Sequence, residues 1–372
     1  MNSPALPAPD RLALIERARR HVLAEGAAQG GVEPWIERSW RRCLANGQRP
    51  EQHVSFDLVS AATARRTRDE AHGLAAAARP LMEKLSRTIA QTHYFAVLTN
   101  ADGVVVDVGP SALLTLPQAR LIARVGVDLS ERAIGTSAIG AALTELQPVW
   151  LHRGEHFFAD TGVYSCAGAP IFDPRGRCAG MLDLTGINTQ ERPELRHVVT
   201  HFARAIENAW VATQPHRLLV QLNWPGRAPG HDDDGLVALD ADGVLVGTNS
   251  AARQMLGTPP DAAHAQDLFA LQADLLFDAA RRGASLEVPL WSGLRVLACP
   301  VLAGAGHAVR QLPAALPTGP GTPLRQIEAD LIRQAVDEAH GNVATAARRL
   351  GVSRATVYRK LASLVRGRIR KV

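Results

Sequence analysis

The last fifty residues limit the possible folds of this chain more than any other stretch. Thr322, before a proline, is a helix start, and apolar residues then recur at helical spacing until Gly341, which ends the helix. A short second helix follows Asn342, and Gly351 allows a sharp turn before a third helix, which Ser353 caps. A helix, a short helix, a glycine-containing turn and a capped third helix predict an all-α helix-turn-helix.

The positive charge of the chain is concentrated in this stretch. Residues 324–372 hold 11 Arg or Lys and 4 Asp or Glu, a balance of +7, whereas the whole chain carries +5 and the remainder therefore −2. A localised basic footprint is what phosphate binding needs. On the third helix, small residues opposite the apolar stripe let the helix enter a groove, and Arg354 and Arg359 can reach base edges or phosphates. The stretch therefore predicts binding to double-stranded DNA; a basic module that binds RNA or an acidic protein is the alternative.

The run GNVATAARRLGVSRATVYRKL, residues 341–361, resembles the C-terminal DNA-binding domain of the Fis family, which bacterial enhancer-binding activators share. The shared pattern is G-N, A-A, L-G-V-S-R, T-V and R-K-L. The resemblance implies a homodimer whose interface is the first helix of the module. It also implies DNA contacts from six residues of the third helix and its start: Ser353, Arg354, Thr356, Tyr358, Arg359 and Lys360.

Length and composition exclude several classes of protein. A chain of 372 residues has room for two or three domains, and no apolar run is long enough to span a membrane. The N-terminus lacks the plan of a secretion signal. The four cysteines are widely spaced and form no CxxC pair, which argues against a disulfide framework and a zinc site. We therefore expect a cytoplasmic protein that needs no cofactor or metal and contacts no membrane.

Residues 95–211 alternate between predicted strands and helices. Two hairpins turn at Asn-Ala-Asp-Gly and at Asp-Pro-Arg-Gly, one helix ends near Glu145, and a helix over about 190–211 closes the unit. This order predicts an antiparallel sheet with helices on one side and a pocket on the other. The predicted strands are Phe95–Leu98, Val104–Val108, Val149–Leu151, Cys166–Phe172 and Cys178–Leu184.

Three runs in this region resemble the GAF sensory domain of activators of the acetoin-catabolism-regulator (AcoR) type: GVDLSERAIGTSAIGAALTELQPV, GEHFF and YSCAGAPIFDPRGRCAGMLDLTG. The segment IERSWRRCLANGQRP resembles the N-terminal block of the same activators. The resemblance implies that the domain binds a small organic effector of the aldehyde, alcohol or ketone class. The candidate effector contacts, for which a role in the core or in loops is the alternative, are His93, Phe95, Leu129, Ile134, Thr136, His156, Phe157, Cys166 and Asp183.

Residues 235–302 form a further unit, in which two strands around an Asp-Gly turn precede a helix and two later strands. The unit resembles a small PAS-like domain, and we expect it to act as a scaffold or dimerising element. The predicted fold is thus multidomain α+β. Its parts are an N-terminal helical region (1–92), a GAF domain whose antiparallel sheet is flanked by helices (93–212), a linker (213–234), the PAS-like α+β domain (235–302), a second linker (303–322) and the helix-turn-helix (323–372).

Full enhancer-binding activators carry an AAA+ ATPase between their sensory part and their helix-turn-helix. That ATPase needs a G-x-x-x-x-G-K-[ST] loop to hold nucleotide phosphates, and this sequence contains neither that loop nor the G-A-F-T-G-A loop for sigma-54 contact. We therefore expect a regulator that lacks the ATPase and makes no sigma-54 contact.

The sequence favours an effector-responsive transcription regulator that is not an enzyme. One alternative is a GAF-domain redox enzyme resembling methionine sulfoxide reductase, for which Cys166 and Cys178, on paired strands, are the candidates. The other is an architectural DNA-binding protein that ignores small molecules. Binding to DNA with and without effector separates the regulator from the architectural protein, and a methionine sulfoxide reduction assay on the wild type and Cys166→Ser tests the enzyme.

Overall fold

The computed structural model describes residues 11–304, apart from 26–30, 227–229, 232 and 258–261, together with residue 343. The chain divides into two compact units, residues 1–305 and 306–372, and all helices and strands below belong to the first. The six expected DNA contacts, Ser353, Arg354, Thr356, Tyr358, Arg359 and Lys360, lie outside the described residues. So do the second linker, except residues 303 and 304, and the helix-turn-helix, except residue 343.

The described part of the N-terminal region contains four helices, which agrees with the helices expected there. Pro34 stands in the first turn of the second helix, where its missing N–H costs nothing, and the Ser60 side chain caps the third by accepting from the amide of Thr63. The helices are α1 (Arg11–Arg20, continued by a π-helical turn, His21–Glu25), α2 (Pro34–Ala45), α3 (Ala61–Glu70) and α4 (His72–Ile89). An extended segment, residues 46–59, connects α2 to α3.

The first sheet contains the five strands that the sequence predicts, each with bounds within a few residues of the expected ones. Its strand order is β2-β1-β5-β4-β3 and every neighbouring pair is antiparallel. The long β4–β5 hairpin turns at Asp173–Gly176, where glycine adopts a φ of 85° that other residues rarely reach. The strands are β1 (Tyr94–Asn100), β2 (Val105–Val108), β3 (Val149–His152), β4 (Tyr164–Phe172) and β5 (Cys178–Ile187).

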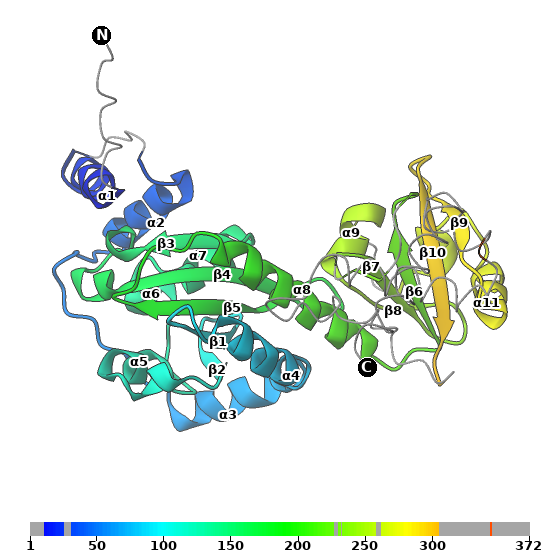
Figure 1. The fold of residues 1–372 in the computed structure, drawn as a ribbon, viewed down its shortest axis with the longest axis horizontal. Helices are drawn as coiled ribbons and strands as arrows, with labels where there is room; N and C mark the ends of the chain where they lie inside the picture. The colour runs from blue at the N-terminus through cyan, green and yellow to red at the C-terminus, as the bar shows by residue number, and fades with distance from the viewer. Residues whose placement is uncertain are drawn as a thin grey trace, which may run out of the picture. The chain divides into compact units, whose positions relative to one another are not determined.

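Helices cover both faces of this sheet, whereas the sequence led us to expect them on one side only. Along β5, Leu182 and Leu184 face an apolar cluster shared with α4 and α8 (Leu195–Ala212), and Met181 faces a second cluster shared with α2 and α7 (Ala138–Glu145). Small residues on α7 let it pack directly against β4 and β5, which is how the second face is closed (Figure 1). The shorter elements are η2 (Ala112–Thr115), α5 (Pro117–Ile122), α6 (Glu131–Ile134), η3 (Arg153–Glu155) and η4 (Ala159–Val163).

A second antiparallel sheet, of order β8-β7-β6-β10-β9, has its own apolar cluster. Its central strand β6 (Leu218–Asn223) lies inside the segment expected to be a linker, 213–234, so that expectation was wrong there. The prolines near this short apolar run are typical of a linker, and the strand with which it pairs, β10, lies about eighty residues later, so no local signal indicated a strand. The remaining elements are β7 (Gly235–Leu239), β8 (Leu245–Thr248), α9 (Ser250–Leu256), α10 (Ala265–Leu268), α11 (Ala273–Arg282), β9 (Leu286–Pro289) and β10 (Arg295–Leu302). Within the described ranges, we find no helix long and apolar enough to cross a bilayer.

Candidate functional site

A small cavity lies on the α7 side of the first sheet. Its volume of about 30 Å³ is room for one or two water molecules, and its walls are mostly apolar. Side chains from β4, β5, α6, α7 and the 153–161 loop region form most of the wall. The lining residues are Phe56, Ile122, Leu129, Ile134, Ser137, Ala138, Ile139, His156, Thr161, Tyr164, Cys166, Asp183 and Thr185.

The most unusual feature of this cavity is a buried carboxyl group, that of Asp183. The residue lies in the middle of β5, between Val97 and Gly168 on the neighbouring strands, and it is fully buried. One carboxyl oxygen, Oδ2, accepts a hydrogen bond from the Thr185 hydroxyl, whereas Oδ1 has no partner among the described residues. Burial raises the pKa of Asp183 to about 7, and the Thr185 hydroxyl opposes part of that rise. A buried oxygen without a partner costs free energy, so a group that satisfies it would bind here with a gain.

His156 supplies a second polar group on the cavity wall. Its Nδ1 lies 2.9 Å from the carbonyl oxygen of Arg153, and because a carbonyl only accepts, Nδ1 carries the hydrogen in the neutral ring. Burial lowers the pKa of His156 to about 4, so the ring is neutral at physiological pH and its Nε2 is an acceptor. The cavity thus combines an uncharged imidazole with a carboxyl group in apolar surroundings.

Five of the nine expected effector contacts line this cavity: Leu129, Ile134, His156, Cys166 and Asp183. The other four lie elsewhere. Phe95 and Phe157 are buried in the adjoining apolar cluster, Thr136 contacts α2, and His93 is exposed just before β1.

Sequence reasoning missed several lining residues, among them Phe56, Tyr164 and Thr185. Thr185 follows Asp183 by two positions, so the period of a strand places both on one face, and that signal could have found it. Phe56 belongs to a segment without helix or strand periodicity, and no sequence pattern points to it.

The two cysteines proposed as a redox pair are not brought together. Cys166 lies opposite Thr185 on the hairpin, whereas Cys178 lies opposite Phe172 near the turn. This register separates them by several residue pairs, or roughly 20 Å at the rise of a strand. All four cysteines are free, and burial raises the pKa of the Cys166 thiol well above its ordinary value. The arrangement does not favour a dithiol enzyme at this site.

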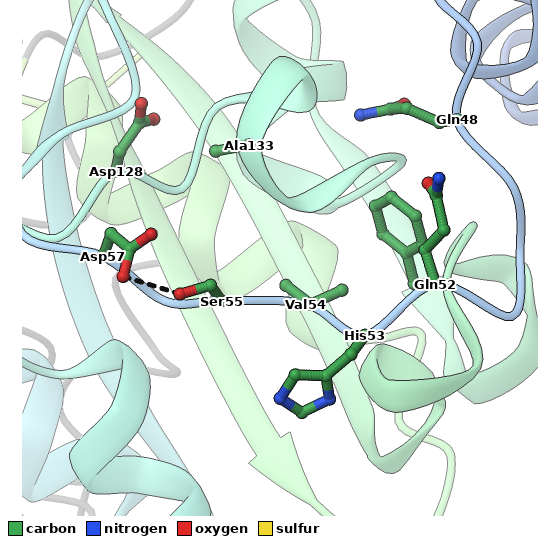
Figure 2. Close-up of a pocket in the computed structure, with 9 residues that line it drawn as sticks. Gln48, Gln52, His53, Val54, Ser55, Asp57, Asp128 and Ala133 are labelled. Carbon is green, nitrogen blue, oxygen red and sulfur yellow. Dashed lines mark hydrogen bonds between the residues drawn. The ribbon is translucent and has the colours of Figure 1, made fainter.

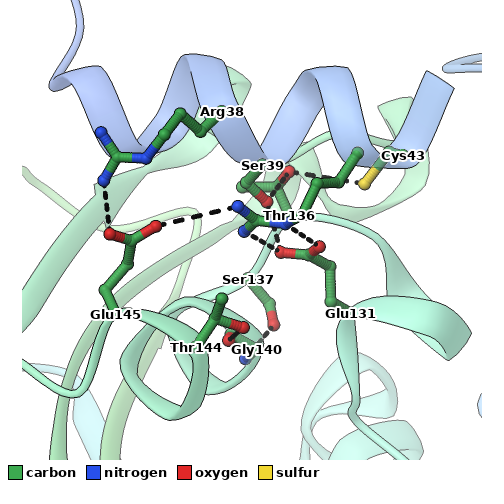
Figure 3. A network of polar contacts seen from close by, with 10 residues as sticks. Arg38, Ser39, Cys43, Glu131, Thr136, Ser137, Gly140, Thr144 and Glu145 are labelled. Atoms are coloured by element: carbon green, nitrogen blue, oxygen red, sulfur yellow. Dashed lines mark hydrogen bonds and ion pairs between the residues drawn. The ribbon is translucent and has the colours of Figure 1, made fainter. Parts of the chain in front are cut away.

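A polar network joins α2 to the segments that carry the cavity wall (Figure 3). Arg42 binds the carboxylate of Glu131 through two contacts of 2.8 Å, and the Ser39 hydroxyl lies 2.6 Å from Glu131 and 2.7 Å from the Thr136 hydroxyl. Arg38 pairs with Glu145 at the other end of α7. Since Ile134 and Ser137, on either side of Thr136, line the cavity, α2 contacts the cavity wall directly.

The loop that carries His156 is held by the first two helices. Arg19 of α1 donates to the carbonyl oxygens of Gly154 (3.1 Å), His156 (2.5 Å) and Phe157. Trp40 of α2 is fully buried, and its indole N–H donates to the carbonyl oxygen of Glu155 at 2.9 Å.

Arg11 of α1 forms an ion pair with Glu155, whose side chain is fully buried. Burial raises the pKa of Glu155 to about 7, and the charge of Arg11 opposes that rise. The helices α1 and α2, which we call the cover, thus contact the 154–157 loop behind the cavity as well as the α6–α7 segment beside it.

Comparison with known proteins gives two family matches. Residues 13–208, more than half of the chain, match the family described as the MimR N-terminal domain, and residues 323–364 match the family described as bacterial regulatory protein, Fis family. The first match spans the first sheet and all but the outer ends of α1 and α8, and the second spans most of the segment predicted from sequence to be a helix-turn-helix.

Two curated relatives that the chain resembles are named as transcription regulators. The chain is 28% identical over 264 residues to an acetoin catabolism regulatory protein of Cupriavidus necator, covering 69% of this chain and 39% of that protein. It is 31% identical over 250 residues to the propane 2-monooxygenase operon transcriptional activator MimR of Mycolicibacterium goodii, covering 65% and 40%. The chain thus spans about two fifths of the length of these two relatives.

Among solved structures, the crystal structure of the E. coli DhaR(N)–DhaL complex matches with 15% identity and a TM-score of 0.46, covering 72% of this chain and 99% of that chain.

Proposed function

The chain belongs to the family of the MimR N-terminal domain, and on that premise we propose that it is a transcription regulator that binds operator DNA and responds to a small organic effector in the cavity beside Asp183. The match of residues 323–364 to the Fis family supports the DNA-binding part. The proposal of effector sensing rests on the unpartnered Oδ1 of Asp183 in a cavity whose walls are mostly apolar. The antiparallel sheet with helices on both faces supports a GAF domain over residues 93–212, and the second sheet a PAS-like domain that begins at β6.

The cavity favours an uncharged effector with one hydrogen-bonding group. A carboxylate would meet the carboxyl of Asp183 in apolar surroundings, where like charges are strongly disfavoured. An alcohol can donate to Oδ1, and a ketone or aldehyde can accept from the protonated carboxyl, which is well populated because the pKa of Asp183 is about 7. The aldehyde, alcohol or ketone class is therefore our proposal for the effector.

The cover can transmit the effect of a bound effector to the rest of the protein. A molecule that pushes on Ile134 or Ser137 displaces the segment around Thr136, and with it the Ser39 and Arg42 contacts of α2. We propose that this shift changes how two copies of the chain present their recognition helices to DNA. In this proposal the protein is a cytoplasmic homodimer that acts without ATP hydrolysis and without sigma-54 contact.

The experiment compares the affinity of the whole chain for its own upstream DNA in the presence of three four-carbon probes, 2-butanol, 2-butanone and butyrate. The alcohol or the ketone is expected to change the affinity for DNA, and butyrate is not. Asp183→Leu, which keeps an approximate shape but removes both oxygens, should abolish the response while leaving binding without probe unchanged. DNA affinity that no probe alters, in wild type as in the variant, would favour an architectural DNA-binding protein.

A further inference from the structure

An open groove lies on the outside of the first domain, next to the cavity. It has a volume of about 520 Å³, and Figure 2 shows the extended segment between α2 and α3 running along it. Side chains from that segment line the groove together with Asp128 before α6, Ala133 in α6 and Phe158. The lining residues are Gln48, Gln52, His53, Val54, Ser55, Asp57, Asp128, Ala133 and Phe158.

The wall between the groove and the cavity is one residue thick. Three backbone segments contribute adjacent side chains to the two hollows. Asp128 and Ala133 line the groove, while their neighbours Leu129 and Ile134 line the cavity. In the third segment, Ser55 and Asp57 line the groove, and the residue between them, Phe56, lines the cavity.

Phe56 is the least buried residue on the cavity side of this wall. Of the described residues that line the cavity, it is the one that is not buried. Its ring meets the ring of Tyr164 edge-on, with centroids 6.3 Å apart and planes at 82°, so it closes the cavity against the opposite wall. Phe56 belongs to no helix or strand, and no regular element fixes the direction of its side chain.

The segment around Phe56 is fixed on both sides. On one side, the amide of Val54 donates to the carboxylate of Asp160 at 3.1 Å. On the other, the carbonyl oxygen of Asp57 accepts from the amide of Asp128 at 3.1 Å. The carbonyl oxygen of Phe56 itself accepts a hydrogen bond from the exposed Arg124 side chain at 2.8 Å. The ring of Phe56 can therefore rotate into the groove without breaking the contacts that hold the segment.

The small size of the cavity requires that part of its wall move before an effector can bind, and Phe56 is the lining residue best placed to do so. A volume of about 30 Å³ holds one or two waters, whereas small-molecule sites have roughly 300 Å³ or more. Moving the ring outward opens the cavity to the groove and adds the volume of a phenyl group. We propose that Phe56 is the gate of the effector site. Its ring swings into the groove to admit a small uncharged molecule, and the position it takes over the bound molecule limits the size that is accepted.

This inference rests on the proposed function, but the gate can be tested without effector or DNA, because Cys166 lies inside the cavity. In methyl methanethiosulfonate the Cys166 thiolate attacks the sulfenyl sulfur, forms a mixed disulfide and releases methanesulfinate. The rate of labelling at Cys166 in the native chain, followed by peptide mass spectrometry, reports how often the cavity opens. Cys43 is buried on α2 with its thiol against the Thr136 hydroxyl, and it lines neither the cavity nor the groove. Its labelling rate in the same sample therefore reports global unfolding.

Phe56→Ala should speed labelling of Cys166 about tenfold or more, which corresponds to about 1.4 kcal/mol in the opening equilibrium, and should leave Cys43 unchanged. Leu58→Ala is the matched control, because Leu58 lies on the same segment, is 55% exposed and does not line the cavity; it should change neither rate. Phe56→Leu is a milder change that keeps the test available if the alanine variant fails to fold. It should also speed labelling of Cys166, but by less than the alanine variant.

An unchanged rate at Cys166, or a rise that Cys43 shares, would overturn the gate. Such a result leaves the proposed function standing, since an effector could enter elsewhere. Conversely, a gate that behaves as described in a chain whose DNA affinity ignores every probe would reject the proposed function alone.

Discussion

Replacing Asp183 by Asn tests whether the cavity holds a strained carboxyl. The folded-state pKa of Asp183 is about 7, above the ordinary value of 3.8, because burial penalises the charged form. Below pH 3.8 the carboxyl is protonated in the folded and the unfolded chain alike. Between the two values the folded chain holds a proton that the unfolded chain has lost, so the free energy of unfolding falls as pH rises, and the loss is complete above pH 7.

The magnitude follows from the two pKa values. A difference of about 3 units corresponds to about 4 kcal/mol, of which about 3 kcal/mol is lost between pH 5 and pH 8. Asparagine has nearly the same shape and does not titrate, so its amide adds only an offset that does not depend on pH. The free energy of unfolding of Asp183→Asn, relative to wild type, should therefore rise by about 3 kcal/mol from pH 5 to pH 8.

Native-state hydrogen exchange of peptides from β5 measures this difference within the whole chain, after correction for the intrinsic exchange rate at each pH. Asp57→Asn, which removes an exposed carboxylate from the outer groove, controls for the change in net charge. A relative stability of Asp183→Asn that is the same at pH 5 and pH 8 would refute the reasoning, because the carboxyl would then ionise without cost in the folded protein.

Three further changes have defined outcomes. Arg42→Met removes the paired contacts between α2 and α6 and should lower the free energy of unfolding by about 1–2 kcal/mol, whereas Arg281→Met, at an exposed pair, should cost less than about 1 kcal/mol; urea titration checks both. Gly180→Ala places a Cβ 2.0 Å from a β1 carbonyl oxygen and should cost at least about 3 kcal/mol by the same titration, whereas at Gly162 an alanine meets no atom within 4 Å and should change stability by less than about 0.5 kcal/mol. Arg354→Ala should weaken binding to the specific operator by about 1–3 kcal/mol and binding to unrelated DNA much less, as titration with both DNAs would show; an equal loss on both would indicate that Arg354 contacts phosphate alone.

The strands of the first sheet could be predicted because their signals are local. The β4 and β5 segments are apolar runs on either side of an Asp-Pro-Arg-Gly turn, and the structure forms them where the sequence predicts. Asp183 stood out as a single carboxyl within such a run, and this led to its selection as a candidate before its surroundings were known.

What the sequence did not predict depends on contacts between distant segments. The strand β6 is recognisable only through its pairing with β7 and β10, and its flanking prolines and glycine are typical of a linker. Thr136 was expected at the effector, but its hydroxyl binds Ser39 of α2 nearly a hundred residues earlier. Phe56 reaches the cavity from an irregular segment for the same reason: tertiary packing, and no local propensity, sets its position.

The central claim is that the cavity beside Asp183 and the DNA-binding segment influence each other. The most direct test of this claim is to measure whether their effects on each other's affinity are reciprocal. If a probe such as 2-butanone changes the affinity of the chain for its operator by some factor, operator DNA must change the affinity for that probe by the same factor. The measurement is the dissociation constant of the probe with and without saturating operator DNA, in wild type and in Asp183→Leu. We expect a matching factor in wild type and no binding of the probe in the variant. A probe affinity that ignores DNA, or one that survives the loss of Asp183, would contradict the coupling between cavity and DNA.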